Sequence, residues 1–228
     1  MESTPRTLLR LHIEAVWGVQ LPPITQNSVE LLSEGIQPPW KLYAVDVAGS
    51  QVAIWRPDVA ATERDALLVR AREALAVPPT ERVAPHISRE VALHQVASPS
   101  MSVAAAQQVA RLLTSDDQAL VDTFDPGSVE YYFHPHRRPL IGVIVEGRLL
   151  SLVHSSRRTP QACELGIDTL PEARRKGYAL AATLLWARGV TQEDLIPFYS
   201  ASAENSASLG LASAAGYRAF AQAVIIEE

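Results

Sequence analysis

The sequence contains a single cysteine, Cys163, among its 228 residues. An internal disulfide therefore cannot form, and one free thiol is typical of a protein from a reducing compartment. No stretch reaches the roughly 20 apolar residues that a membrane-spanning helix needs. The first dozen residues lack the long apolar run and the small-residue cleavage site of a secretory signal. We therefore expect a cytoplasmic protein with no membrane partner.

A strong excess of charge of either sign is also missing. The chain has 20 Lys and Arg residues against 25 Asp and Glu residues, and its formal net charge is -5. The basic residues are scattered instead of gathered in one stripe, so binding to nucleic acid is not expected. The pair His134 and His136 is the closest histidine spacing, but no second pair completes a zinc site, and we predict no metal.

The N-terminal 90 residues predict a small α+β region of unknown role. Residues 41–47 and 51–55 have the β-branched and aromatic content of two strands, joined by a Gly-Ser turn. Thr62 and Asp65 resemble a capping box, which indicates a helix that Pro78 would end. The apolar residues of that helix recur at helical spacing: Leu67, Leu68, Ala71, Ala74 and Leu75.

Residues 91–228 predict a second, larger domain with alternating strands and helices. The clearest pair is 139–145 and 148–154, two apolar runs joined by Glu146-Gly147 as in a hairpin. The remaining elements follow from hydrophobic periodicity. In order, the predicted elements are strand 91–96, helices 103–113 and 116–124, strands 139–145, 148–154 and 162–169, helix 172–188, strand 195–203, helix 205–215 and strand 217–226.

The most informative segment is ELGIDTLPEARRKGYA, residues 164–179, which we interpret as a strand, a turn and the opening of a helix. The first turn of a helix has unpaired N–H groups and a partial positive charge, so it attracts anions. Gly177 permits a close approach to the backbone, and three adjacent basic residues add positive charge. Close packing against the sheet is the alternative explanation for Gly177. The pattern favours a pyrophosphate site.

The pattern Arg-x-x-Gly-x-Ala at residues 174–179 resembles the acetyl-CoA signature of the GNAT superfamily of N-acetyltransferases. A second segment, PFYSASAENSAS at 197–208 followed by AGYR at 215–218, is similar to a later motif of that family. This resemblance covers a little over half of the chain, from about residue 91. It implies an α/β GNAT fold: a mixed central sheet with splayed fourth and fifth strands, flanked by helices.

The resemblance also implies where acetyl-CoA binds. The pantetheine arm would lie in the gap between the splayed strands and bind the edge of the fourth strand as an added strand would. Asn205 could offer its amide to the arm, although Asn is also a common helix N-cap. The expected cofactor-binding residues are Ile167, Asp168, Thr169, Leu170, Arg174, Arg175, Lys176, Gly177, Tyr178, Ala179, Asn205 and Ser208.

Acetylation of an amine requires a base to remove a proton from the ammonium form. The resemblance makes Glu164 the first candidate, the alternative being an exposed carboxylate at a strand end. His154 is a second candidate base, although a lone histidine on an apolar strand is more often structural. We interpret Cys163 as a small buried hydrophobe and not as a nucleophile.

Many relatives carry a tyrosine acid seven residues after the asparagine, where this chain has Ala212. Tyr199, Tyr217 or a water are the possible substitutes, and the sequence does not choose among them. The aromatic run 131–134 lines the acceptor pocket in one reading and belongs to the core in the other.

The sequence therefore predicts an N-acetyltransferase that moves the acetyl group of acetyl-CoA directly to a small-molecule or peptide amine, with a homodimer as one candidate assembly. The rival is an acyl-CoA-binding or regulatory module that has lost turnover. An enzyme that binds nucleotide phosphates is a weaker rival, since the P-loop pattern is absent.

Overall fold

The computed structural model describes residues 4–227, which divide into two compact units. Unit 1 contains the residues up to Leu93, together with Ser200–Leu209 and the chain from Ala219 onward. Unit 2 contains His94–Tyr199 and Gly210–Arg218. Two C-terminal segments thus belong to unit 1, so these units do not follow the boundary at residue 90 that the sequence suggests. The division into a region 1–90 and a domain 91–228 remains a prediction.

Unit 1 is built on a sheet with the strand order β1-β3-β2-β10-β4. Strand β2 pairs antiparallel with both β3 and β10, and β1 pairs parallel with β3. Strands β4 and β10 also contribute residues to unit 2. The elements are α1 (Pro5–Trp17), β1 (Ser28–Glu30), β2 (Leu42–Val47), β3 (Ser50–Trp55), α2 (Ala61–Ala76), β4 (Ile87–Gln95) and β10 (Tyr217–Ile226).

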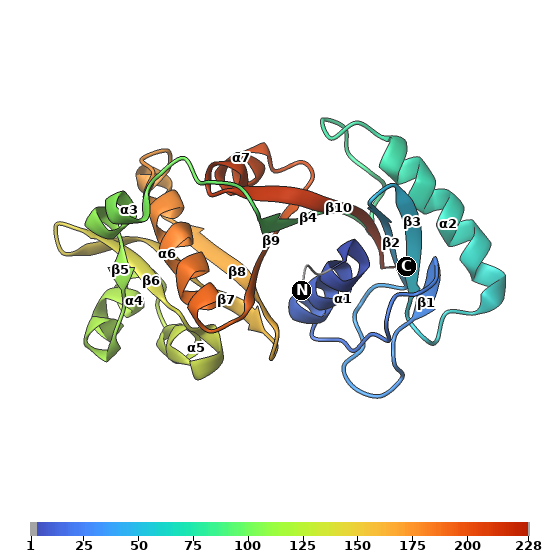
Figure 1. Ribbon diagram of the computed structural model, residues 1–228, viewed down its shortest axis with the longest axis horizontal. Helices are drawn as coiled ribbons and strands as arrows, with labels where there is room; N and C mark the ends of the chain where they lie inside the picture. The colour runs from blue at the N-terminus through green and yellow to red at the C-terminus, as the bar shows by residue number, and fades with distance from the viewer. Residues whose placement is uncertain (1–3, 228) are drawn as a thin grey trace. The chain divides into compact units, whose positions relative to one another are not determined.

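The two helices of unit 1 cover opposite faces of its sheet (Figure 1). Successive side chains of a strand point to opposite faces, so β2 supplies both layers of the core. Tyr43 and Val45 pack in the layer that contains Leu9 of α1. Leu42 and Ala44 pack in the layer that contains Leu67 of α2.

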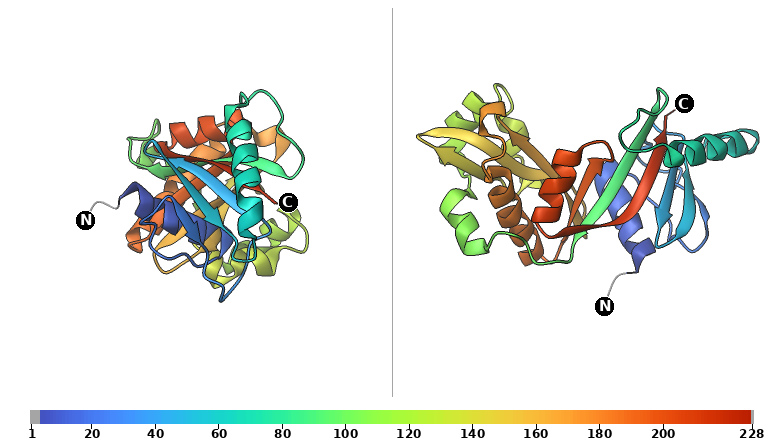
Figure 2. Two further views of the ribbon diagram at one scale, coloured as in Figure 1. Left: turned by 90° about the vertical axis from the view of Figure 1, so that its right-hand side faces the viewer. Right: turned by 90° about the horizontal axis from the view of Figure 1, so that it is seen from above.

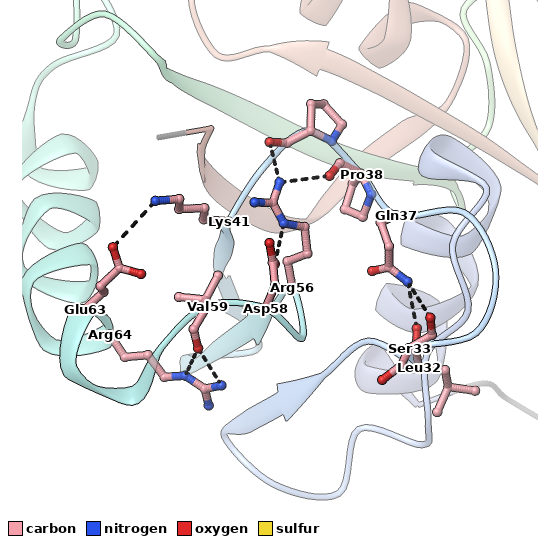
Figure 3. Close-up of polar contacts among 11 residues, drawn as sticks. Leu32, Ser33, Gln37, Pro38, Lys41, Arg56, Asp58, Val59, Glu63 and Arg64 are labelled. Atoms are coloured by element: carbon pink, nitrogen blue, oxygen red, sulfur yellow. Dashed lines mark hydrogen bonds and ion pairs between the residues drawn. The ribbon is translucent and has the colours of Figure 1, made fainter.

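Polar contacts fasten the long loop before β2 to the turn before α2 (Figure 3). The guanidinium of Arg56 donates to the carbonyl oxygens of Pro38 and Pro39, at 3.3 and 3.0 Å, and to Asp58 at 2.6 Å. The pKa of Asp58 is lowered, mainly by its hydrogen bond with Arg56. Lys41 and Glu63 form an ion pair at 3.6 Å beside it.

Unit 2 is built on a mixed sheet with the strand order β9-β8-β7-β6-β5. Neighbouring strands from β5 to β8 are antiparallel, whereas β8 and β9 are parallel. The elements are α3 (Val103–Val109), β5 (Arg111–Leu112), α4 (Gln118–Phe124), α5 (Val129–Phe133), β6 (Ile141–Val145), β7 (Arg148–Arg158), β8 (Ala162–Thr169), α6 (Tyr178–Gln192), β9 (Ile196–Ser202) and α7 (Ser206–Ala214), the last two of which extend into unit 1.

Helix α6 packs against β6, β7 and β8, and α3 packs against α6 (Figure 2). Trp186 of α6 is fully buried and donates to the Ser155 hydroxyl of β7 at 3.1 Å. On the other side of β7, Leu152 shares a core with Val121 of α4 and Tyr132 of α5. The sheet of unit 2 is therefore enclosed by helices on both faces.

Most predicted elements are confirmed, and the ranges predicted for β8 and β10 match the structure at both ends. Several details of the prediction were wrong, and helix α1 and strand β1 were not predicted. Helix α2 begins after Ala60 without a side-chain cap, so Thr62 and Asp65 form no capping box. Helix α3 ends at Val109 and is followed by the short strand β5. Helix α5 was not expected at all, and helix α6 begins at Tyr178 instead of residue 172.

Within residues 4–227, no helix has both the length and the apolar character needed to cross a membrane.

Candidate active site

Helix α6 begins with a backbone arrangement suited to an anion. Gly177 is its N-cap and has a φ of 80°, a conformation that side-chain-bearing residues rarely adopt. The first helical hydrogen bond runs from the Ala181 N–H to the Gly177 carbonyl at 3.0 Å. Within the described chain, the N–H groups of Gly177, Tyr178 and Ala179 have no hydrogen-bond acceptor. These N–H groups are therefore available to a ligand.

The three basic residues lie in the loop before α6, which corrects the expectation that they occupy its first turn. Residues 171–173 form a short 3-10 helix, and Arg174, Arg175 and Lys176 follow it with exposed side chains. Arg175 has a φ of 60°, which turns the chain toward Gly177. The positive charge therefore stands just outside the helix end, where it adds to the field of the helix dipole.

Strand β8 has a free edge beyond Glu164. Its pairing with β9 covers only Ala162–Glu164, with Phe198 opposite Glu164, although β8 continues to Thr169. Within the described residues, the register of these two strands stops there. The predicted separation of the fourth and fifth strands is thus confirmed in β8 and β9. Four predicted cofactor residues lie at or just beyond this free edge: Ile167, Asp168, Thr169 and Leu170.

Glu164 lies at the last paired position of β8 and is 5% exposed. The alternative reading of an exposed carboxylate is therefore wrong. The Tyr217 ring lies 5.5 Å from that of Tyr199, centroid to centroid. Burial raises the pKa of Tyr217 well above its usual value, and the charges of Glu164 and Tyr199 raise it further. The structure thus groups one candidate base with both tyrosines that the sequence suggested as acids.

His154, the second candidate base, is buried in β7 opposite Gly166 of β8. A Cβ atom on Gly166 would stand 2.4 Å from Cε1 of the imidazole, so only glycine leaves room for this ring. Burial, and then the charge of Arg137, lower the pKa of His154 to about 4. The histidine is therefore uncharged at neutral pH.

Two tyrosines of α5 enclose the His154 ring, which sequence reasoning did not foresee. The rings of Tyr131 and Tyr132 meet it edge to face, at centroid distances of 5.5 and 5.1 Å. The hydroxyl of Tyr131 lies 3.3 Å from His154 Nε2, and this tyrosine is 43% exposed. Gly166 inside a strand was the one available signal, because such a glycine often marks a close approach.

Tyr132 links α5 to β8 from a buried position. Its hydroxyl lies 3.2 Å from Asp125 Oδ2 and 3.3 Å from Asp168 Oδ2. Burial, followed by the charges of these two carboxylates, raises the pKa of Tyr132. Of the predicted aromatic run, Tyr132 therefore belongs to the core, whereas Tyr131 reaches the surface.

Comparison with known proteins agrees with this geometry. Residues 128–223 match the family model described as GNAT acetyltransferase. Residues 128–223 form a GNAT domain. The match contains α6, β8 and the His154 surroundings, and it confirms the resemblance that the two motifs indicate. It covers less than half of the chain.

A solved structure shows the same fold. An acetyltransferase from the GNAT family of Colwellia psychrerythraea is 12% identical, with a TM-score of 0.51, over 76% of this chain and 75% of that chain. A protein assigned to the GNAT family from Novosphingobium aromaticivorans is 22% identical, with a TM-score of 0.49, over 66% of this chain and 68% of that chain. No curated protein matches the chain.

Asn205 of the later GNAT motif caps helix α7. Its Oδ1 accepts from the Ser208 N–H at 3.0 Å, which confirms the N-cap interpretation. The cap uses the side-chain oxygen, so the amide nitrogen remains a possible donor to a ligand. Asn205 and Ser208 belong to unit 1, and their contact with the cofactor stays a prediction.

Ala212 and Cys163 limit which residues of the GNAT domain could act as a proton donor or a nucleophile. Ala212, at the position where the resemblance implies a tyrosine, is fully buried in α7. Cys163 is fully buried in β8, and burial raises the pKa of its thiol, which suits a packing role better than a nucleophile. Within residues 4–227, no three His, Cys, Asp or Glu side chains are grouped as metal ligands.

Proposed function

We propose that this protein is an N-acetyltransferase that transfers the acetyl group of acetyl-CoA to an amine by direct attack. The observation that carries the proposal is the free edge of β8, which leads from Glu164 toward the open N–H groups at Gly177. An extended arm on this edge would have its phosphates at the helix end and its thioester near Glu164.

The phosphates would be bound by main-chain donors and by charge. The N–H groups of Gly177, Tyr178 and Ala179 lie at the start of α6 and would donate to the phosphates, and a side chain at Gly177 would stand in their way. Arg174, Arg175 and Lys176 add positive charge from the preceding loop. A long-chain ligand held at both ends is positioned before reaction, which lowers the entropic part of the barrier.

The favoured base is Glu164. It is buried at the point where the strands separate, and it lies close enough to Tyr217 to affect that tyrosine's pKa. His154 is the weaker candidate, because a group with a pKa of about 4 binds a proton poorly near neutral pH. The amine would lose one proton to Glu164 as its nitrogen attacks the thioester carbon.

The acceptor would be a small-molecule or peptide amine, and the reaction needs no metal. We propose a cytoplasmic location, which the lone buried thiol of Cys163 supports.

Free thiol release tests this proposal. The protein is mixed with acetyl-CoA and a panel of primary amines, including lysine peptides and polyamines, and the CoA thiol is followed with a chromogenic disulfide. We expect amine-dependent release, and a drop of about 100-fold in kcat for Glu164→Gln.

Glu146→Gln is the matched control, because Glu146 is an exposed carboxylate in the β6–β7 turn. We expect it to retain wild-type turnover. Binding of acetyl-CoA without thiol release by any amine would indicate a cofactor-binding module and contradict the enzyme proposal.

A further inference from the structure

We propose that Tyr131 donates the proton that the departing CoA thiolate needs, and that His154 positions the Tyr131 hydroxyl for this transfer. The inference rests on the proposed acetyl transfer. It gives a role to a side chain from α5, a helix that supplies no residue to the motifs, and it accounts for the missing tyrosine at Ala212.

The position of the proton on His154 decides where the Tyr131 hydrogen points. Nδ1 of His154 is buried and has no hydrogen-bond partner, whereas Nε2 lies 3.3 Å from the Tyr131 oxygen. A proton on Nδ1 would leave a buried N–H without an acceptor, which is rarer in proteins than an unused lone pair. The neutral ring therefore carries its proton on Nε2 and donates it to Tyr131.

As a result, the Tyr131 hydroxyl accepts from the protein side and has its own hydrogen free for a ligand. An oxygen that accepts a hydrogen bond is polarised as a donor in the next. Tyr131 is 43% exposed while its ring contacts His154 and Tyr132, so a ligand can reach this side chain from solvent.

Arg137 places a positively charged group next to Tyr131. Its guanidinium carbon lies 3.9 Å from the centroid of the Tyr131 ring, and one of its nitrogens donates to the carbonyl of Ser156, which fixes it there. A cation over an aromatic face favours electron density on that ring. Arg137 and the His154 N–H thus both stabilise the negative charge that develops on the Tyr131 oxygen as its proton leaves.

His154 also lies close to Glu164 along the paired strands β7 and β8. His154 is opposite Gly166, two residues beyond Glu164 and one before the predicted pantetheine edge begins at Ile167. Glu164 and Gly166 share one face of β8, because residues two apart in a strand do. The base and the proton donor would then flank the thioester from neighbouring positions.

The proton and bond balance is simple. The ammonium form of the acceptor first loses one proton to water. The neutral amine nitrogen then forms a bond to the acetyl carbon and gives one proton to Glu164, while the C–S bond breaks and the sulfur takes one proton from Tyr131. Water then returns a proton from Glu164 to Tyr131. The products are the acetylated amine and free CoA thiol.

A change of leaving group tests the role of Tyr131. A selenolate is a much weaker base than a thiolate and leaves without protonation, so acetyl-CoA is compared with its selenoester analogue. We expect Tyr131→Phe to lower kcat about 100-fold with acetyl-CoA and to lower it far less with the selenoester. KM for acetyl-CoA should stay within about twofold, because the interaction is made only in the transition state.

Tyr132→Phe is the matched control, since it removes a hydroxyl from the next residue of the same helix. This variant should change kcat by the same factor with acetyl-CoA and with the selenoester. His154→Leu should reproduce part of the Tyr131→Phe pattern. His154→Gln retains a donor N–H and should therefore behave more like the wild type.

The outcomes separate the two proposals. A wild-type protein that releases no thiol overturns the acetyl transfer and this inference together. An active wild type whose Tyr131→Phe variant is unchanged, or is impaired equally with both leaving groups, overturns the role of Tyr131 alone.

Discussion

At the scale of single residues, the site depends on Gly166, which leaves room for the ring of His154. Gly166 has no side chain, so the His154 ring lies against the backbone of β8 with two tyrosines around it. Such a ring is far from water, and its charged form is disfavoured by burial. In our proposal, the burial that keeps His154 neutral makes it a hydrogen-bond donor to Tyr131 instead of a base.

This burial predicts an acid-sensitive contribution to stability. The pKa of His154 is about 4 in the folded protein and near 6.5 in an unfolded chain, so the unfolded state binds more protons between these values. The stabilisation is present above pH 6.5 and is lost as the pH falls to 4. We expect the free energy of unfolding, from urea titrations at pH 7 and pH 4, to drop by up to about 3 kcal/mol more in the wild type than in His154→Gln. Equal drops in both proteins would show that His154 is not buried in this way.

At the scale of elements, the turn between β9 and α7 is held by one buried arginine. Arg89 of β4 donates to Glu204 at 2.6 Å and to the carbonyl groups of Val77, Pro78 and Glu81. All five residues belong to unit 1, and Glu204 immediately precedes Asn205. One guanidinium therefore fixes both the segment after α2 and the start of α7.

Removal of the Arg89 guanidinium should lower the free energy of unfolding. The Arg89 side chain is 5% exposed, so Arg89→Met would leave three carbonyl groups and a carboxylate without their donor. We expect a loss of about 3 kcal/mol in the free energy of unfolding, measured by urea denaturation. Arg72→Met, on the exposed side of α2, is the control and should stay within about 0.5 kcal/mol of the wild type. Equal stabilities of the two variants would contradict the role given to Arg89.

The elements also show why sequence reasoning succeeds in some places and fails in others. Strands β8 and β10 are bounded by turn residues and follow a clear apolar pattern, so their ends are predictable. Helix α6 was started too early, because Pro171 opens a separate 3-10 turn and Gly177 adopts a left-handed conformation that no sequence pattern reveals. The aromatic run of α5 has strand-like composition, and its helical form follows from tertiary packing.

At the scale of the molecule, the match to the GNAT family and the geometry at β8 and α6 support each other within unit 2. The GNAT fold was predictable because two motifs with fixed spacing lie in it. The His154 surroundings were not predictable, because Tyr131, His154 and Gly166 meet only through the register of β7 and β8 and the packing of α5. The match of residues 128–223 to the GNAT family supports the proposed cofactor class, whereas the acceptor remains a prediction.

The central claim is that a diphosphate binds the main-chain N–H groups at Gly177, and calorimetric titration with coenzyme A tests it most directly. We expect the wild type to bind, and Gly177→Glu to weaken binding by at least about 1.4 kcal/mol, a factor of ten. Gly147→Glu is the matched control: Gly147 also has a positive φ, 75°, but lies in the β6–β7 turn, and this variant should bind as the wild type does. No heat from coenzyme A at millimolar concentration, or equal affinity in the wild type and Gly177→Glu, would contradict the assignment of this site.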